Sequence, residues 1–92
     1  MIMTISSSDL ISPKMDKNVQ KAIGNNIRAL RENAGLTQEL LATRLQLEGL
    51  DITRSAVAKI EVGQRHLYPD EIILIKKILN VSFDEIFEYE AK

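Results

Sequence analysis

Two short stretches of this chain carry side chains that could bind an anionic partner. The first is Thr53–Glu61, where Arg54, Ser55 and Lys59 fall on the outer side of a short predicted helix. Guanidinium and ammonium groups donate hydrogen bonds and attract negative charge, while a hydroxyl both donates and accepts. The second is Thr37-Gln38, which opens another predicted helix. Taken alone, the outer side chains could equally form a solvated face, so the residues by themselves leave both readings open.

The other reactive residue types do not form a catalytic or metal-binding group. Ser55 has no histidine spaced to activate it. The chain has one histidine, His66, and no cysteine, so we expect His66 to be a loop residue rather than a metal ligand. The doublets Asp70-Glu71 and Asp84-Glu85 each stand at a predicted helix start, where capping and the helix dipole account for them. We expect no catalytic residues, no metal and no cofactor.

Composition favours one small helical domain. The 92 residues are 45% hydrophobic but only 4% aromatic, so the core should be aliphatic. The lack of cysteine favours a reducing, cytoplasmic location. No apolar run is long enough to span a bilayer, and the N-terminus is a poor signal peptide, so no membrane partner is expected.

Charge is unevenly distributed along the chain, although the net charge is only −1. Residues 21–65 hold seven Lys or Arg against five Asp or Glu, whereas residues 66–92 hold three against six. The middle of the chain is therefore mildly basic and the C-terminal end acidic. This distribution is compatible with DNA binding through one face of the molecule.

Five helices are predicted to position these residues. Apolar residues at three- and four-residue steps predict a first helix that ends at Asn33. Gly24 inside this helix is expected to lower its stability locally. Thr37 and Thr53 are suited to cap the second and third helices. The residues suited to the left-handed position after a helix are Gly35, Gly49, Gly63 and Asn80.

The last two helices follow a polar loop at residues 64–68. Pro69 suits the first position of the fourth helix, and Ser82 with Glu85 forms a capping box that opens the fifth. We expect residues 1–17 to be a flexible N-terminal tail and residues 18–90 to be the folded domain.

The fourth helix is apolar beyond a single stripe. Leu74 and Ile78, with Phe87 in the fifth helix, are either additional core or a contact surface. A small domain offers limited interior, so we favour a homodimer formed through the fourth and fifth helices.

The order of these motifs resembles the phage-repressor and Cro-like helix-turn-helix proteins, the Xre family. The matching segments are Ile23–Arg31, Gly35–Gln38, Leu41-Ala42, Ser55–Glu61 with Gly63, and Leu79–Phe87. The resemblance implies an all-α, five-helix, lambda-repressor-like DNA-binding domain. Its second and third helices would form the helix-turn-helix, and the third would lie in the major groove of double-stranded DNA.

The resemblance also implies roles for individual residues. Those expected to face bases are Arg54, Ser55 and Lys59. Those expected to contact phosphate are Thr37, Gln38, Thr53, Gln64, Arg65 and His66. An internal ion pair is expected between Arg31 and Glu61.

The sequence departs from the family pattern at several positions. Residues 47–52 make a longer turn than usual before the third helix, which could shift that helix. Leu40 stands where a capping glutamate is usual, and Val62 replaces a polar residue that could contact phosphate. Lys76 stands where a small buried residue is usual, which suggests either that its stem snorkels or that the packing is locally rearranged.

Three functions remain open at this point. The first is a sequence-specific DNA-binding transcriptional regulator, expected to be a repressor. The second is an antitoxin that binds a toxin partner as well as its own operator. The third is a protein–protein adaptor that keeps the fold without binding DNA, which the near-neutral charge and Val62 favour. Arg54, Lys59 and Arg65 oppose the adaptor more strongly.

Overall fold

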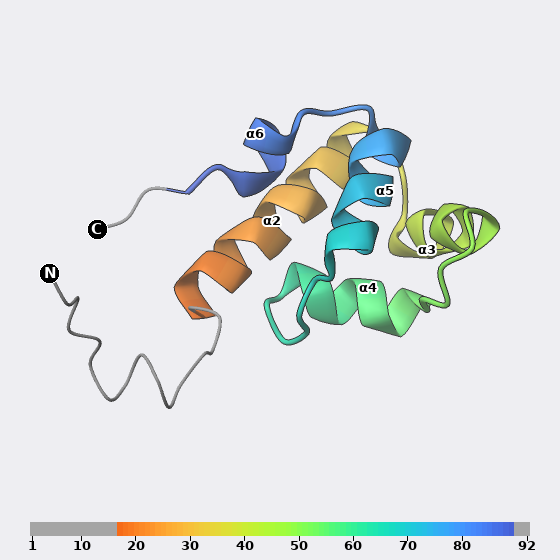
Figure 1. Cartoon of the computed structure of the whole chain (residues 1–92), viewed down its shortest axis with the longest axis horizontal. Coiled ribbons are helices and arrows are strands. Elements are labelled where there is room, and N and C mark those ends of the chain that lie inside the picture. Colours follow the sequence, from red (N-terminus) through yellow and green to blue (C-terminus); the bar gives the residue numbers. More distant parts are fainter. Residues whose placement is uncertain (1–16, 90–92) are drawn as a thin grey trace, which may run out of the picture.

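The computed structural model describes residues 17–89, which fold into five helices without a strand in that range (Figure 1). The helices are α2 (Lys17–Asn33), α3 (Gln38–Leu47), α4 (Arg54–Glu61), α5 (Pro69–Leu79) and α6 (Phe83–Phe87). The predicted all-α, five-helix fold is confirmed. The predicted tail lies outside the described residues except for Lys17, which begins α2. No described helix is long and apolar enough to cross a membrane.

Short-range chemistry accounts for the helix boundaries. The Thr37 hydroxyl accepts a hydrogen bond from Leu40 N at 3.0 Å, and the Thr53 hydroxyl accepts one from Ala56 N at 3.1 Å. Ser82 and Glu85 exchange hydrogen bonds of 3.1 and 3.0 Å, so the predicted capping box is present. The left-handed residues after the helices are Gly35, Gly49, Gly63 and Asn80.

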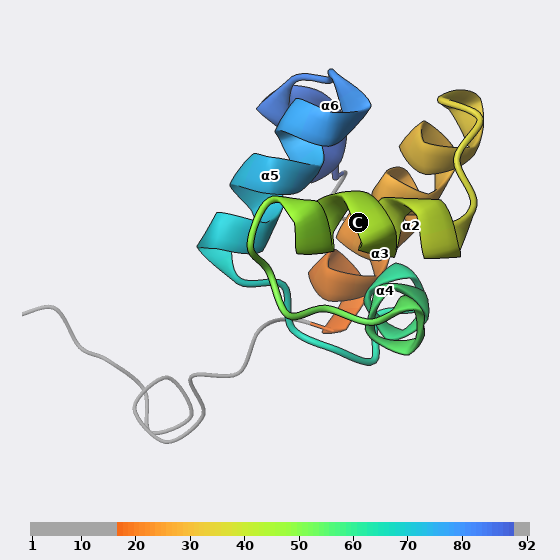
Figure 2. The ribbon, with the colours of Figure 1, turned by 90° about the vertical axis from the view of Figure 1, so that its right-hand side faces the viewer.

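The core is aliphatic and lies where α2 meets α4 and α6 and where α3 meets α4 and α5. Figure 2 shows α4 nearly end-on beneath α3, with α5 and α6 on the opposite side of α3 from α4. The buried hydrophobic residues are Ile27, Leu36, Leu41, Ala42, Leu45, Ile52, Val57, Ile60, Ile75, Leu79 and Ile86. Val57 and Ile60 are the inner side of α4, as the sequence predicts.

The apolar residues of α5 and α6 divide between core and surface. Leu74 and Ile78 are half-buried and packed against the core, so they do not form the open surface that the dimer prediction assumed. Phe87 is 43% exposed, and its ring stacks on that of Phe83 with the centroids 6.3 Å apart. Lys76 Nζ lies 5.1 Å from the centre of the Phe83 ring, so its half-buried stem does carry the charge outward.

Gly24 lies where α2 crosses α4 backbone against backbone. A Cβ added at this position would collide with the carbonyl oxygen of Ile60 and would lie 2.8 Å from that of Glu61. Gln20, one turn earlier, donates to the carbonyl of Gly63 at 2.7 Å. Gly24, which the sequence analysis expected only to lower helix stability, therefore allows α2 and α4 to approach each other closely.

We predict that Gly24→Ala destabilises the protein. In an unconstrained helix this change stabilises by about 0.5–1 kcal/mol, but here the methyl group must displace the backbone of α4, at a cost of about 1–3 kcal/mol. Thermal unfolding should show a lower melting temperature. Asn25→Ala, at the next and exposed position, is the matched control and should not lower it. An unchanged or raised melting temperature for Gly24→Ala would contradict the close approach.

Candidate nucleic-acid interface

A buried carboxylate at the end of α4 collects hydrogen bonds from two other helices. Glu61 is 1% exposed, and its Oε2 lies 2.6 Å from Arg31 Nε of α2. Its Oε1 accepts from Arg31 Nη2 at 3.1 Å and from Gln38 Nε2 of α3 at 3.0 Å. The ion pair expected between Arg31 and Glu61 is thus present. The hydrogen bond to Glu61 raises the pKa of Arg31, so the guanidinium stays charged despite its burial.

The same arginine also reaches the turn before α3. Arg31 Nη1 donates to the carbonyl oxygen of Leu36 at 2.7 Å. The side chain therefore joins the end of α2, the start of α3 and the end of α4. We call Arg31, Gln38 and Glu61 the buried junction, because these side chains fix three helix ends relative to one another.

The outer side of α4 is open to solvent. Arg54, Ser55 and Lys59 are all exposed, while Val57 and Ile60 on the opposite side are buried. The side chains of Arg54, Ser55 and Lys59 can therefore reach a partner without disturbing the core. The helix N-terminus is exposed too, because Thr53 lies at the surface. A polar, cationic side next to a helix N-terminus offers hydrogen-bond donors and positive potential to an anion.

The start of α3 offers a second helix N-terminus, but the Gln38 side chain is already engaged. Thr37 is exposed and caps the helix. Gln38, predicted to contact phosphate, is half-buried and points its amide at Glu61. Its side chain in this structure is part of the buried junction, and its contact with phosphate stays a prediction.

The loop after α4 also differs from expectation at one residue. Gln64 and His66 are exposed, as a phosphate-contacting loop requires. Arg65, however, forms a two-pronged pair with Glu71, with Nη1–Oε1 and Nη2–Oε2 distances of 2.9 Å each. Its guanidinium also lies 5.6 Å from the centre of the Tyr68 ring. Arg65 therefore ties the loop to α5 instead of projecting freely, and its contact with phosphate stays a prediction.

The turn between α3 and α4 is long but anchored. Ile52 is 1% exposed and its carbonyl oxygen accepts from Gln46 Nε2 at 2.7 Å. Leu50 N donates to the carbonyl of Leu45 at 3.1 Å. The turn thus has a defined course, and its end is anchored by buried Ile52, two residues before α4 begins. Sequence reasoning missed Gln46, because nothing local shows which carbonyl its amide will meet.

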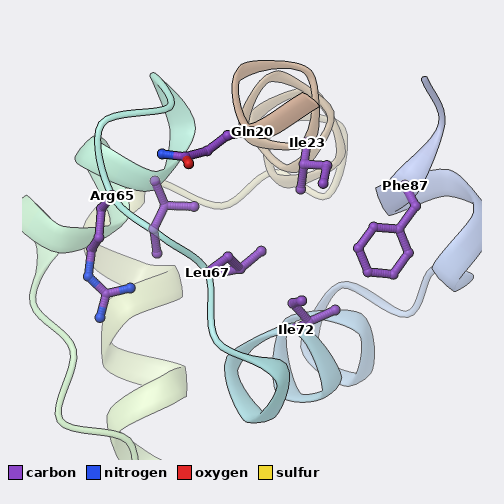
Figure 3. A pocket seen from close by; sticks show the side chains of 8 residues that line it. Gln20, Ile23, Arg65, Leu67, Ile72 and Phe87 are labelled. Atoms are coloured by element: carbon purple, nitrogen blue, oxygen red, sulfur yellow. The ribbon is translucent and has the colours of Figure 1, made fainter. Parts of the chain in front are cut away.

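An apolar hollow lies on the side of α4 that carries buried Ile60 (Figure 3). Its walls come from α2, from the loop after α4, from α5 and from α6. The residues that line it are Gln20, Ile23, Gly24, Ile60, Arg65, Leu67, Ile72 and Phe87. Among residues 17–89, no group of three His, Cys, Asp or Glu side chains could hold a metal ion.

Comparison with known proteins decides the family. A helix-turn-helix family model matches residues 27–86, most of the described chain. The chain belongs to the helix-turn-helix family. The restriction-modification controller protein C.AhdI from Aeromonas hydrophila is 35% identical, with a TM-score of 0.63 over 74% of this chain and 96% of that one. The DNA-binding domain of BldD shares the fold, with a TM-score of 0.68 at 20% identity over 79% of this chain and 99% of that one. No curated protein matches the chain significantly in sequence.

We predict that Arg31→Ala, in the buried junction of this helix-turn-helix protein, lowers stability more than DNA affinity per folded molecule. Removing one partner of a buried pair leaves the carboxylate of Glu61 without its main donor, at a cost of about 3–5 kcal/mol. Thermal melts and DNA titrations corrected for the folded fraction separate the two effects. Arg28→Ala, which breaks the exposed pair with Glu32, should cost under about 0.5 kcal/mol. An unchanged melting temperature for Arg31→Ala would exclude a structural role.

We predict that Glu71→Gln lowers the free energy of unfolding near neutral pH and that this effect becomes smaller at acidic pH. Burial raises the pKa of Glu71, but hydrogen bonds from Arg65 and Tyr68 N and the nearby arginine charge outweigh it and bring the pKa below the ordinary 4.5. A lowered pKa stabilises the fold above the unfolded-state value and loses this effect as pH falls through the folded-state value.

The measurement is urea unfolding of both proteins from about pH 7 down to about pH 3. At about pH 7, Glu71→Gln should lower the free energy of unfolding by about 1–3 kcal/mol. The difference in this free energy between parent and variant should become smaller below about pH 4.5. Glu88→Gln, at an exposed position, should differ from the parent by less than about 0.5 kcal/mol throughout. A gap for Glu71→Gln that does not depend on pH would show that its charge does not stabilise the fold.

Proposed function

We propose that this protein is a sequence-specific regulator of transcription that binds double-stranded DNA through α4 in the major groove. The observation that carries the proposal is the exposed, cationic outer side of α4, held by the buried junction beside the capped N-terminus of α3. A helix supported in this way can enter a groove as a rigid unit. A protein that occupies a DNA site can block access to it, so we expect this protein to act as a repressor. We expect it to act in the cytoplasm.

Individual residues of the interface fall into two classes. Arg54, Ser55 and Lys59 are proposed to read base edges, since arginine pairs with guanine O6 and N7 and lysine is a more tolerant donor. Phosphate contacts are proposed for Thr37, Thr53, Gln64 and His66, which are exposed at two helix starts and in the loop after α4.

The relatives support this proposal. The 35% identical protein C.AhdI is a controller protein of a restriction-modification system, and the structural neighbour from BldD is a DNA-binding domain. The net charge of −1 implies that affinity comes from the local cationic side of α4 rather than from a general attraction to nucleic acid.

We also propose that the protein binds DNA as a homodimer through α5 and α6. The exposed apolar side chains of these helices are Ile73, Phe83 and Phe87, and exposed Tyr89 lies two residues beyond the end of α6. Two-fold symmetric regulators bind half-sites about 34 Å apart, so a dimer would select a palindrome. Since Leu74 and Ile78 are half-buried against the core, the seam proposed here is centred on Phe87 instead.

We predict that selection from a random duplex pool enriches a palindromic sequence. Arg54→Ala and Lys59→Ala should each weaken binding to the enriched duplex by about 1–3 kcal/mol. Affinity should fall steeply with salt, because bound phosphates release counterions. Fluorescence anisotropy over a salt series measures both effects.

The matched control is Lys77→Ala, which removes an exposed α5 lysine paired with Glu48. It should leave the affinity for the enriched duplex within about twofold. If no sequence is enriched and binding to random duplex does not depend on salt, the protein is not a DNA-binding regulator and the adaptor function is favoured.

A further inference from the structure

The apolar hollow beside α4 is left uncovered by the part of the chain that the structure describes. α2 packs against α4 and α6, and α5 packs against α3, so the hollow lies between two helices, α2 and α5, that do not pack extensively on each other. Figure 3 shows the side chains of Ile23, Leu67 and Ile72 converging on it from three elements. These three residues are only half-buried, and Phe87 is 43% exposed. Covering them would remove apolar surface from water, which stabilises a fold.

The polar groups that line the hollow are already engaged elsewhere. Gln20 Nε2 donates to the carbonyl oxygen of Gly63 at 2.7 Å, and the guanidinium of Arg65 is paired with Glu71. The hollow therefore suits an aliphatic group better than an anion or a polar ligand. Its volume is about 70 Å³, several times the roughly 10–15 Å³ that one water needs, so it has room for an aliphatic side chain.

The segment that precedes α2 carries side chains of this kind. Leu10 and Ile11 are adjacent branched aliphatic residues, and Ser12-Pro13 follows them. Because helical backbone is disfavoured before proline, the sequence predicts that α2 does not continue back through this point. The chain from Ile11 to Lys17 can span up to about 20 Å when extended, whereas Ile23 lies only about 9 Å along α2 from Lys17. The segment is thus long enough to fold back to the hollow.

We propose that Leu10 and Ile11 fold back along the first turns of α2 and fill the apolar hollow. Covalent attachment to α2 gives this segment a high effective concentration at the hollow, which a separate molecule with the same apolar surface would lack. The filled hollow connects Ile72 of α5 and Phe87 of α6 to the start of α2. Residues 10–16 then belong to the folded domain, in contrast to the flexible tail that the sequence led us to expect.

The first test is the thermal stability of the full chain. The double variant Leu10→Ser with Ile11→Ser should lower the melting temperature by about 4 °C or more, because the hollow loses its apolar contents. The double variant Ile2→Ser with Ile5→Ser removes as many aliphatic side chains from the same segment. This matched control should melt at the same temperature as the parent. An unchanged melting temperature for the first variant would overturn the proposal.

The second test is disulfide formation, which is specific here because the chain has no cysteine of its own. Ile11→Cys with Ile72→Cys should form a disulfide within one molecule under mild oxidation, since the bond requires the two Cα atoms to lie within about 7 Å. Ile11→Cys with Asn25→Cys is the matched control, because Asn25 is exposed on α2 next to Gly24. This control pair should react at least about tenfold more slowly, since the docked segment is held away from Asn25.

The rates and products of the two cysteine pairs distinguish the alternatives. Equal rates would show that the segment moves freely, and a disulfide-linked dimer would show that the hollow takes the segment of a second copy. Either result would overturn the proposal. Neither measurement contains DNA, so a failure to enrich a duplex would overturn the proposed function without affecting the contact between the N-terminal segment and the hollow.

Discussion

The structure depends on satisfying one buried carboxylate. A charged group as buried as Glu61 is tolerated only when donors surround it, since an unpaired buried charge costs several kcal/mol. Those donors come from α2 and α3, so the requirement of a single side chain fixes the ends of three helices. The exposed cations of α4 owe their orientation to this arrangement. The buried hydrogen bonds of Glu61 thereby determine how the exposed polar side chains of α4 are presented to a partner.

The parts of the fold that the sequence predicted well are those set by neighbouring residues. Thr37, Thr53 and the capping box at Ser82 depend on atoms three residues away, so their positions follow directly from the chain. The glycine stops are equally local, because a positive φ excludes most side chains. The pairing of Arg31 with Glu61 spans thirty residues and was accessible only through resemblance to a family.

The parts that the sequence did not predict depend on which groups the fold brings together. The Gln38 amide could have pointed outward, and only the packing of α3 against α4 directs it to Glu61. Arg65 was assigned to phosphate through the family resemblance, yet Glu71 lies close enough to hold it. The position of Glu71 at a predicted helix start accounted for its charge, but it gave no sign that the carboxylate would also hold an arginine. Base contacts depend on the pose of α4 on DNA, which the chain alone does not specify.

The contact at Gly24 has a consequence for how deeply α4 can project. Because main chain meets main chain there, the separation of α2 and α4 is set by peptide atoms instead of by rotamers that can rearrange. We therefore expect mutations that resize the core elsewhere to leave the separation of α4 from α2 unchanged. The outer side chains of α4 can therefore be exchanged without altering the platform that presents them.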